Sequence, residues 1–371
     1  MIERRVVIFL AASLVAGSFF GATTTLASGD PVENNYYVYV AAESEDTVHL
    51  VRFGPDGGEV LKTIRVGAFA TEIEGPHGIR VSPDGRYWYV SIAHGLPYGS
   101  VFKYATGDDV SVSDVQVGLF PATMDISHST GLMFVVNFNL HGDMEPSTVS
   151  VIDTVSMLEV AQIEQGLMPH GSRTSLDGKF HYSVGMMDDT LYEIDVMKLK
   201  IGRTLHLTAN DESAANKNVN HDGHQRAAVK PTWVQPHPTK PLLYVALQGA
   251  DQIVEISLQD WKITRRFHTQ KGPYNLAITP DGKMIIATCK PNNSTAIWDL
   301  ETGKELANVA ASRRLTHGVT VSPDSRFAFV TVEGVADDPG TVDVIDLRTF
   351  ETRASIDVGK QASGIDFWKM E

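Results

Sequence analysis

Cysteine is the scarcest reactive residue of this chain, with Cys289 as its single example among 371 residues. One thiol excludes an internal disulfide, a Cys-x-x-Cys-His haem attachment and an iron–sulfur cluster, because each of these needs more than one thiolate. The sequence also lacks a Gly-rich phosphate loop and a Gly-x-Ser-x-Gly nucleophile motif. Any bound metal would therefore take His, Asp, Glu, Met or water as ligands, and we interpret Cys289 as a small buried residue.

Positive charge is also in short supply, with 31 Lys and Arg against 45 Asp and Glu and a formal net charge of −14. An acidic surface repels polyanions, so the composition argues against nucleic acid and against an anionic membrane surface as partners. The excess of acidic residues mainly favours solubility.

Long hydrophobic runs are confined to the N-terminus. Arg4 and Arg5 precede the short apolar segment 6–22, and small residues form a cleavage site before Ser28. The segment is too short and too rich in Ala, Gly and Ser to favour spanning a bilayer. We therefore expect residues 1–27 to be a signal peptide, and the mature chain to be periplasmic or secreted with no stable membrane insertion after cleavage. An uncleaved anchor is the alternative.

The rest of the chain repeats one sequence frame. Residues 75–78 read Gly-Pro-His-Gly, and residues 82–85 read Ser-Pro-Asp-Gly before an apolar stretch. The frame returns, with substitutions, at residues 169–178, 273–282 and 316–325. Pro at the second and Gly at the fourth position of the turn suit a type I turn between antiparallel strands. Short strands repeated with a period in the forties indicate a β-propeller.

Six units begin with an inner strand, at Pro76, Pro121, Pro169, Pro231, Pro273 and Thr316. Residues 36–66 supply three strands that lack an inner strand, and residues 362–367 supply an inner strand with nothing after it. We therefore predict an all-β, seven-bladed β-propeller, a single domain over residues 28–371, closed by pairing of the N- and C-terminal strands in one blade. Such closure hides strand edges that would otherwise pair with other chains.

One spacing departs from the repeat. The second residues of successive inner strands are 42–48 positions apart, except that His170 and Thr232 are separated by 62. The excess is the polar segment 208–229, which contains His221 and His224. Long insertions in repeat proteins usually map to one face, often the working face. We place this insertion on the face where the inner strands begin, called the top face below.

Histidine recurs at the second position of three inner strands, as His77, His170 and His317. The other inner strands carry Ala122, Thr232, Tyr274 and Ser363 there. A ring of inner strands would aim the three imidazoles at one point on the axis, and imidazole is a common protein ligand of copper and zinc. The simpler alternative is that each histidine caps its strand with a backbone hydrogen bond.

Further histidines share the top face. His94 lies in a loop between a second and a third strand, and His221 and His224 would reach the axis as a lid. The predicted metal ligands are therefore His77, His170, His317, His94, His221 and His224. Without thiolates, such a site suits copper. His141, in the corresponding loop of the next blade, is given a structural role.

Charged residues near the histidines have predicted supporting roles. Arg80 and Arg173 each follow a second-position histidine by three residues and would hold an anionic substrate, although solvation or pairing with Asp is the simpler alternative. Glu333 and Lys290 follow second strands on the top face, and either one would transfer a proton beside a metal; the sequence does not select between them. No catalytic residue is assigned.

The Ser-Pro-Asp-Gly turns and Val-Ile-Asp strand ends resemble those of the YVTN-type seven-bladed propellers, over nearly all of the expected mature chain. The His-Gly pairs at 77–78, 170–171 and 317–318 are similar to the channel histidines of copper propellers such as nitrous oxide reductase and thiocyanate dehydrogenase. That resemblance implies axial histidine ligands for copper. The chain departs from it by lacking a cupredoxin domain, a cytochrome c segment and enough matching histidines for a multinuclear cluster.

Two functions of different class follow from these features. The first is an exported copper protein that acts as an oxidoreductase on a small inorganic sulfur or nitrogen compound. The second is a non-catalytic periplasmic scaffold that binds a partner protein, or a cofactor such as haem d1, on its top face. A lactonase-type hydrolase is a third hypothesis, disfavoured because no inner strand carries an acidic second residue.

Overall fold

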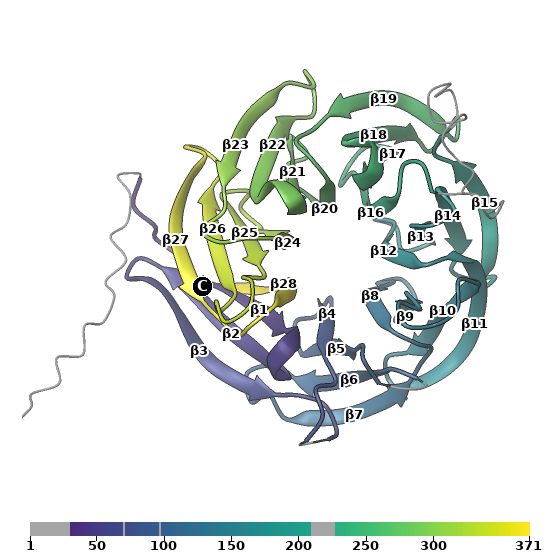
Figure 1. Ribbon diagram of the computed structural model, residues 1–371, viewed down its shortest axis with the longest axis horizontal. Coiled ribbons are helices and arrows are strands. Elements are labelled where there is room, and N and C mark those ends of the chain that lie inside the picture. The colour runs from purple at the N-terminus through teal and green to yellow at the C-terminus, as the bar shows by residue number, and fades with distance from the viewer. Residues whose placement is uncertain (1–29, 70, 96–97, 209–226) are drawn as a thin grey trace, which may run out of the picture.

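The chain forms a ring of seven four-stranded antiparallel blades, as the computed structural model shows (Figure 1). The structure describes residues 30–371 except 70, 96–97 and 209–226. The predicted all-β, seven-bladed propeller is therefore confirmed. The predicted signal peptide, residues 1–27, lies outside the described residues.

Each blade runs from an inner strand at the axis to an outer strand at the rim. Blades 1–3 are β4 (Pro76–Val81), β5 (Tyr87–Ile92), β6 (Ser100–Ala105) and β7 (Ser111–Gln116); β8 (Pro121–Ile126), β9 (Leu132–Asn137), β10 (Pro146–Asp153) and β11 (Leu158–Leu167); and β12 (Pro169–Thr174), β13 (Phe180–Gly185), β14 (Thr190–Asp195) and β15 (Lys200–His206). Blades 4–5 are β16 (Pro231–Pro236), β17 (Leu242–Leu247), β18 (Gln252–Ser257) and β19 (Lys262–His268); and β20 (Pro273–Ile278), β21 (Met284–Cys289), β22 (Ser294–Asp299) and β23 (Glu305–Ala310). Blades 6–7 are β24 (Thr316–Val321), β25 (Phe327–Val332), β26 (Thr341–Asp346) and β27 (Glu351–Asp357); and β28 (Ala362–Met370), β1 (Tyr36–Ala42), β2 (Thr47–Gly54) and β3 (Gly57–Arg65).

Blade 7 joins the two ends of the described chain. The C-terminal strand β28 pairs with β1, with Ile365 opposite Val40 and Asp366 opposite Tyr39. β28 also packs against the inner strands of both neighbouring blades, β24 and β4. The predicted closure by N- and C-terminal strands in one blade is confirmed, and it leaves the ring of inner strands without a gap.

The apolar core lies between blades, where the faces of neighbouring sheets meet. Tyr36 and Phe53 of blade 7 pack with Phe327 and Phe329 of blade 6 in one such cluster. The ring centroids of Phe53 and Phe327 are 5.1 Å apart in an edge-to-face contact. The middle strands read as nearly continuous apolar runs because neighbours cover both of their faces.

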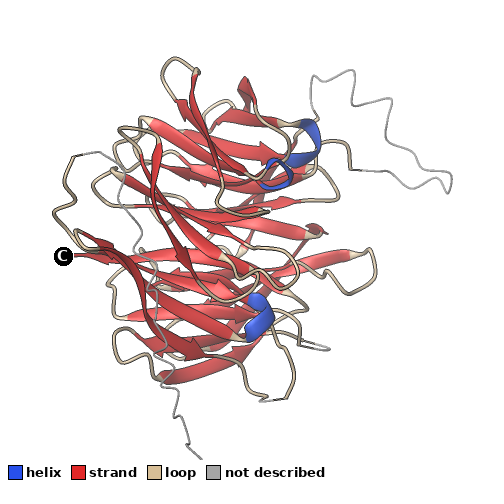
Figure 2. Ribbon diagram, turned by 60° about the vertical axis from the view of Figure 1, so that its left-hand side comes forward, coloured by secondary structure: helices blue, strands red, loops and turns tan. Residues whose placement is uncertain are grey.

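Short turns and loops connect these strands at both faces. At the bottom face, the Gly85 amide donates to the Ser82 carbonyl at 2.8 Å, which closes the predicted turn. At the top face, three 3₁₀ turns follow second strands: η1 (Glu43–Glu45), η2 (Gln248–Ala250) and η3 (Lys290–Asn292), blue in Figure 2. Across the described ranges, no helix is both long and apolar enough to cross a membrane.

Six of the seven inner strands carry a bulge at their second and third residues. In β16 the second residue alone is skipped, because Trp233 pairs with Ala246. In β4, Pro76 pairs with Ile92 and the next pair is Ile79 with Val90, so His77 and Gly78 are skipped by the ladder. The other inner strands show a corresponding register shift. Bulges re-aim side chains and occur next to active sites. Here the bulge presents the second residue of every inner strand at the top of the axis.

The glycine after each of these histidines is required by the close approach of neighbouring inner strands. A Cβ placed on Gly78 would collide with the carbonyl oxygen of Ala122, and one on Gly171 would collide with that of Thr232. The obstacle is backbone in both cases, so it cannot rotate away. The repeated His-Gly pair is therefore partly a packing requirement of the ring.

We predict that Gly78→Ala lowers the free energy of unfolding by about 1–3 kcal/mol, because the added methyl group overpacks the axis. The matched control is Gly202→Ala in β15, where the nearest atom to an added Cβ is 3.6 Å away. That variant should stay within about 0.5 kcal/mol of the wild type. Urea unfolding measures both values, and equal stability of the two variants would contradict the argument.

Candidate functional site

The structure brings three of the predicted ligands together at the top of the axis. His77, His170 and His317 have exposed fractions of 7%, 2% and 6%. The ring centroid of His77 lies 5.3 Å from that of His317 and 6.4 Å from that of His170. These residues are called the histidine ring below. His221 and His224 lie outside the described residues.

Each imidazole of the histidine ring is oriented through its Nδ1 atom. His77 Nδ1 lies 2.9 Å from Glu43 Oε2, and His317 Nδ1 lies 2.6 Å from Glu333 Oε1. His170 Nδ1 lies 2.9 Å from the carbonyl oxygen of Thr232. These partners are acceptors, so Nδ1 carries the proton in each ring. Nε2 is then left with a lone pair, which is the arrangement that metal-bound histidines adopt.

The three Nε2 atoms do not have the same surroundings. None of the hydrogen bonds of the described residues involves Nε2 of His77 or of His317. His170 Nε2, in contrast, accepts a hydrogen bond from the Tyr274 hydroxyl at 2.8 Å. His77 and His317 are therefore open donors of an electron pair, whereas His170 is capped.

Tyr274 is a site residue that sequence reasoning did not select. It occupies the same second position as the histidines, in β20, and its ring lies 4.9 Å from that of His317. The Lys290 ammonium lies 4.6 Å from the centre of the Tyr274 ring. The sequence could have indicated Tyr274, because it occupies the second position of its inner strand, as the three histidines do, and residues at this position face the top of the axis.

Two carboxylates hold the site together. Glu43, the first residue of η1, bridges His77 and His94, with His94 Nε2 2.8 Å from Oε1. Glu333 accepts from both His317 and Lys290, with the Lys290 ammonium 2.5 Å away. Both glutamates immediately follow second strands, so the bulged inner strands and the top-face turns converge on one place.

Burial alone would raise the pKa of each carboxyl group, but its partners outweigh that effect. The charge and hydrogen bond of His77 and the hydrogen bond of His94 hold the pKa of Glu43 well below its usual range. The hydrogen bond and charge of His317 and the charge of Lys290 lower the pKa of Glu333 to about 2. Both groups are therefore carboxylates at neutral pH, as their role as acceptors requires.

Burial keeps two of the imidazoles neutral. It lowers the pKa of His170 to about 3. Burial and the nearby Lys290 charge lower the pKa of His317 to about 4, although the Glu333 contact acts in the opposite direction. A neutral imidazole is the form that binds a metal.

His94 and His141 form a second, more exposed pair at the rim of the site. His94 Nδ1 lies 3.1 Å from His141 Nε2, and both rings pack on Phe120. Both ring nitrogens of His94 are thus hydrogen-bonded, since Nε2 contacts Glu43. We predicted a structural role for His141 from the sequence, and its contact holds His94 in position.

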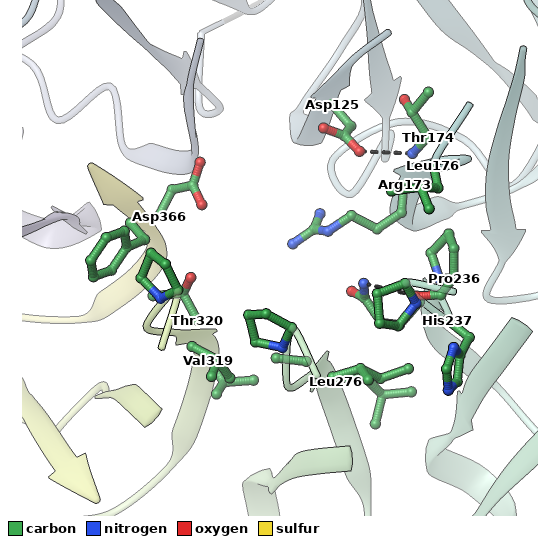
Figure 3. A pocket seen from close by; sticks show the side chains of 18 of the residues that line it. Asp125, Arg173, Thr174, Leu176, Pro236, His237, Leu276, Val319, Thr320 and Asp366 are labelled. Atoms are coloured by element: carbon green, nitrogen blue, oxygen red, sulfur yellow. Dashed lines mark hydrogen bonds between the residues drawn. The ribbon is translucent and has the colours of Figure 1, made fainter. Parts of the chain in front are cut away.

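A charged layer lies at the bottom of the axis, where a cavity of about 500 Å³ opens (Figure 3). The fifth residues of three inner strands, Arg80, Asp125 and Asp366, pair there. Arg80 Nε lies 2.8 Å from Asp125 Oδ1, and Arg80 Nη1 lies 3.3 Å from Asp366 Oδ2. The simpler alternative for Arg80, pairing with Asp, is therefore confirmed.

The sequence candidate Cys289 has a structural role. Cys289 is a free, buried cysteine whose thiol pKa is raised to about 12 by burial, as its interpretation as a small buried residue predicts. Over the described residues, no group of three or more His, Cys, Asp or Glu side chains is already arranged to hold a metal ion. Because Tyr274 caps His170, the imidazoles whose Nε2 lone pairs are available to a metal are those of His77 and His317.

Comparison with known proteins adds no family assignment. No protein-family model matches the chain, and no curated protein is significantly similar to it. The class of protein that the structure defines is the seven-bladed β-propeller. The resemblances to YVTN-type propellers and to copper propellers stay predictions from sequence.

We predict that the free energy of unfolding decreases as the pH is lowered below 6.5, the ordinary pKa of histidine. In that range His170 and His317 bind protons in the unfolded chain but stay neutral in the folded protein. The loss continues down to about pH 4 for His317 and about pH 3 for His170. Protonation of Glu43 and Glu333, whose pKa values are lowered in the fold, acts in the same direction below pH 4.5.

The variant His170→Gln tests this linkage. It should flatten the dependence of unfolding free energy on pH between 6.5 and about 4 by up to about 1.4 kcal/mol per pH unit, the value for one proton. His128→Gln, at an exposed bottom-face turn, should keep the wild-type slope. Urea unfolding across this pH range measures the slopes, and an unchanged slope for His170→Gln would contradict the assignment of a neutral buried imidazole.

Proposed function

We propose that the top of the channel binds a copper ion through His77 and His317, and that the protein is an exported oxidoreductase for a small inorganic sulfur or nitrogen compound. The observation that carries the proposal is a pair of neighbouring imidazoles in edge-to-face contact, 5.3 Å apart between ring centroids, each oriented by a carboxylate. No hydrogen bond of the described residues involves either Nε2 atom. Export rests on the N-terminal sequence alone.

The chemistry of the donors favours copper over other metals. Imidazole is a borderline ligand that suits copper, zinc, iron and nickel, and among divalent first-row ions copper binds such sites most tightly. Carboxylates that accept from Nδ1 raise the basicity of the imidazole and fix its orientation. Two histidines leave coordination positions free, and His170 would become a third ligand if its hydrogen bond from Tyr274 were released.

Copper, when bound, would supply a one-electron redox centre and a Lewis acid. The residues of the chain supply the surroundings. Glu43 and Glu333 hold the imidazoles. Lys290, whose pKa is lowered by burial but raised more by Tyr274 and Glu333, places a protonated ammonium beside the site. It can balance negative charge on a substrate or donate a proton.

Confinement supports a small substrate. Directly below the histidine ring the axis holds a cavity of only about 30 Å³, with His77, His170 and His317 among its lining residues. A single water needs roughly 10–15 Å³ by the same measure, so this space admits a species of only a few atoms. The proposal of a small inorganic substrate agrees with that size.

We predict that the wild-type protein binds copper, and that His77→Ala and His317→Ala each weaken binding by at least about a hundredfold, more than the loss of an outer-shell partner typically costs. His128→Ala is the matched control, because His128 is an exposed imidazole at the bottom face. Elemental analysis and competition with a copper chelator measure stoichiometry and affinity. Full retention of copper by a protein that carries both His77→Ala and His317→Ala would overturn the proposed site.

The carboxylate partner gives a separate prediction. Glu333→Gln keeps an oxygen acceptor but removes the charge that faces His317 and Lys290. Copper affinity should fall by about 10–100-fold, the usual effect of losing an outer-shell carboxylate. Glu351→Gln, at an exposed position of β27, should bind as the wild type does. Chelator competition again provides the measurement, and identical affinities would show that Glu333 does not orient a ligand.

A scaffold function remains the second candidate, because apolar side chains gather on the top-face loops of neighbouring blades. The exposed residues Phe69, Ile73, Tyr98, Leu140 and Met144 lie in the loops between β3 and β4, β5 and β6, and β9 and β10. Exposed apolar surface of this kind suits a protein partner. Failure of the wild-type protein to bind copper would favour this candidate over the oxidoreductase.

A further inference from the structure

The small cavity below the histidine ring, called the chamber here, is lined by polar groups of two kinds. At its upper end lie His77, His170 and His317. Trp233 and Asn275, the third residues of β16 and β20, line its wall, and Arg173, the fifth residue of β12, separates it from the bottom opening. Arg173 and Val319 line both cavities, and of these two residues Arg173 is the charged one.

Two buried polar atoms of the chamber wall have no partner. Trp233 and Asn275 are each 5% exposed, and within the described residues the indole Nε1 of Trp233 and the amide Oδ1 of Asn275 make no hydrogen bond. An unsatisfied buried polar atom costs about 1–3 kcal/mol, so native structures rarely leave such atoms without a partner. The two atoms indicate that a polar species belongs in the chamber.

Arg173 makes no close ion pair among the described residues, although Asp125 and Asp366 attract its charge at longer range. Its Nη1 donates to the Ser172 carbonyl at 2.9 Å, and its guanidinium carbon lies 4.4 Å above the centre of the Trp233 ring. Among the described residues, no carboxylate lies within ion-pairing distance of it. In Figure 3 its side chain extends into the opening.

The nearby carboxylates are already occupied. Asp125 pairs with Arg80 and accepts from the backbone amides of Ile126, at 2.9 Å, and Thr174, at 2.7 Å. Asp366 pairs with Arg80 and accepts from the Val81 amide at 2.8 Å. Burial and the repulsion of Arg80 lower the pKa of Arg173 to about 10, against the attraction of Asp125, and the guanidinium stays protonated at neutral pH.

We propose that the lower end of the chamber binds a small monovalent inorganic anion between the Arg173 guanidinium and the Trp233 indole N–H. Arg173 supplies fixed, charged donors that no carboxylate of the described residues contacts directly, and the Trp233 indole supplies a neutral donor. The Asn275 amide can present its NH₂ group to the same space, because its oxygen and nitrogen are exchangeable by rotation. A volume of about 30 Å³ restricts the ligand to a halide or an ion of a few atoms such as nitrate.

The two ends of the chamber then differ in polarity. Lone pairs of His77 and His317 at the upper end suit a cation, whereas the N–H donors at the lower end suit an anion. The anion site does not depend on copper, since none of its donors is a proposed metal ligand. Its test uses metal-free protein, so that a failure of the copper proposal and a failure of the anion proposal are distinguishable.

The experiment is calorimetric titration of the metal-free, full-length protein with sodium nitrate and, separately, sodium bromide at constant ionic strength. We expect one saturable site, with sulfate failing to compete because of its size and charge. Arg173→Gln should weaken binding by at least about tenfold, the typical effect of losing a charged hydrogen bond. Arg86→Gln, which alters an exposed arginine of a bottom-face turn, should bind as the wild type does.

Trp233→Phe separates an anion site from simple stacking of Arg173 on an aromatic ring. Phenylalanine keeps a ring for the stack but removes the indole N–H, so binding should weaken severalfold while thermal stability changes little. Bromide-soaked crystals should show an anomalous peak between Arg173 and Trp233. Absence of saturable binding, or equal affinity in Arg173→Gln and wild type, overturns the proposal. If Arg173→Gln fails to fold, Arg173→Lys and Trp233→Phe decide it.

Discussion

The close approach of seven inner strands around one axis is the constraint on which the rest of this structure depends. Glycine follows each second-position histidine because a neighbouring carbonyl oxygen occupies the space of a Cβ, as at Gly78. The bulge at the same two residues turns the side chain before that glycine onto the axis. The requirement for packing and the arrangement of the imidazoles therefore have one geometric origin.

Burial then determines the chemistry of the groups that this geometry gathers. Exclusion of water keeps His170 and His317 neutral. The acceptor that contacts Nδ1 of each ring then fixes its tautomer, with the proton on Nδ1. Glu43 and Glu333 stay ionised because imidazoles donate hydrogen bonds to both carboxylates and the Lys290 charge lies beside Glu333. A channel built in this way presents lone pairs at its top and N–H donors around Arg173 below, over the length of one short strand.

Much of the fold was predictable because the repeated turns contain Pro, Asp and Gly, which have strong conformational preferences for turns. Pro at the second and Gly at the fourth position of the turn at residues 82–85 set the end of one strand and the start of the next, β5. The site was predictable only in part. The shared position of His77, His170 and His317 indicated their convergence, whereas the same position of Tyr274 was not used. The partners Glu43 and Glu333 come from other blades or other strands, and a repeat pattern carries no information on such contacts.

The sequence by itself determined the number of blades, the closing strand pair and the position of histidine on three inner strands, because these follow from periodicity and from turn residues. The tertiary structure alone decided which of these histidines is open. Capping of His170 by Tyr274, orientation of His77 by Glu43, and pairing of Arg80 but not Arg173 with carboxylates are contacts between distant segments. They arise only when the ring closes, since closure sets the distances between blades on which every one of them depends.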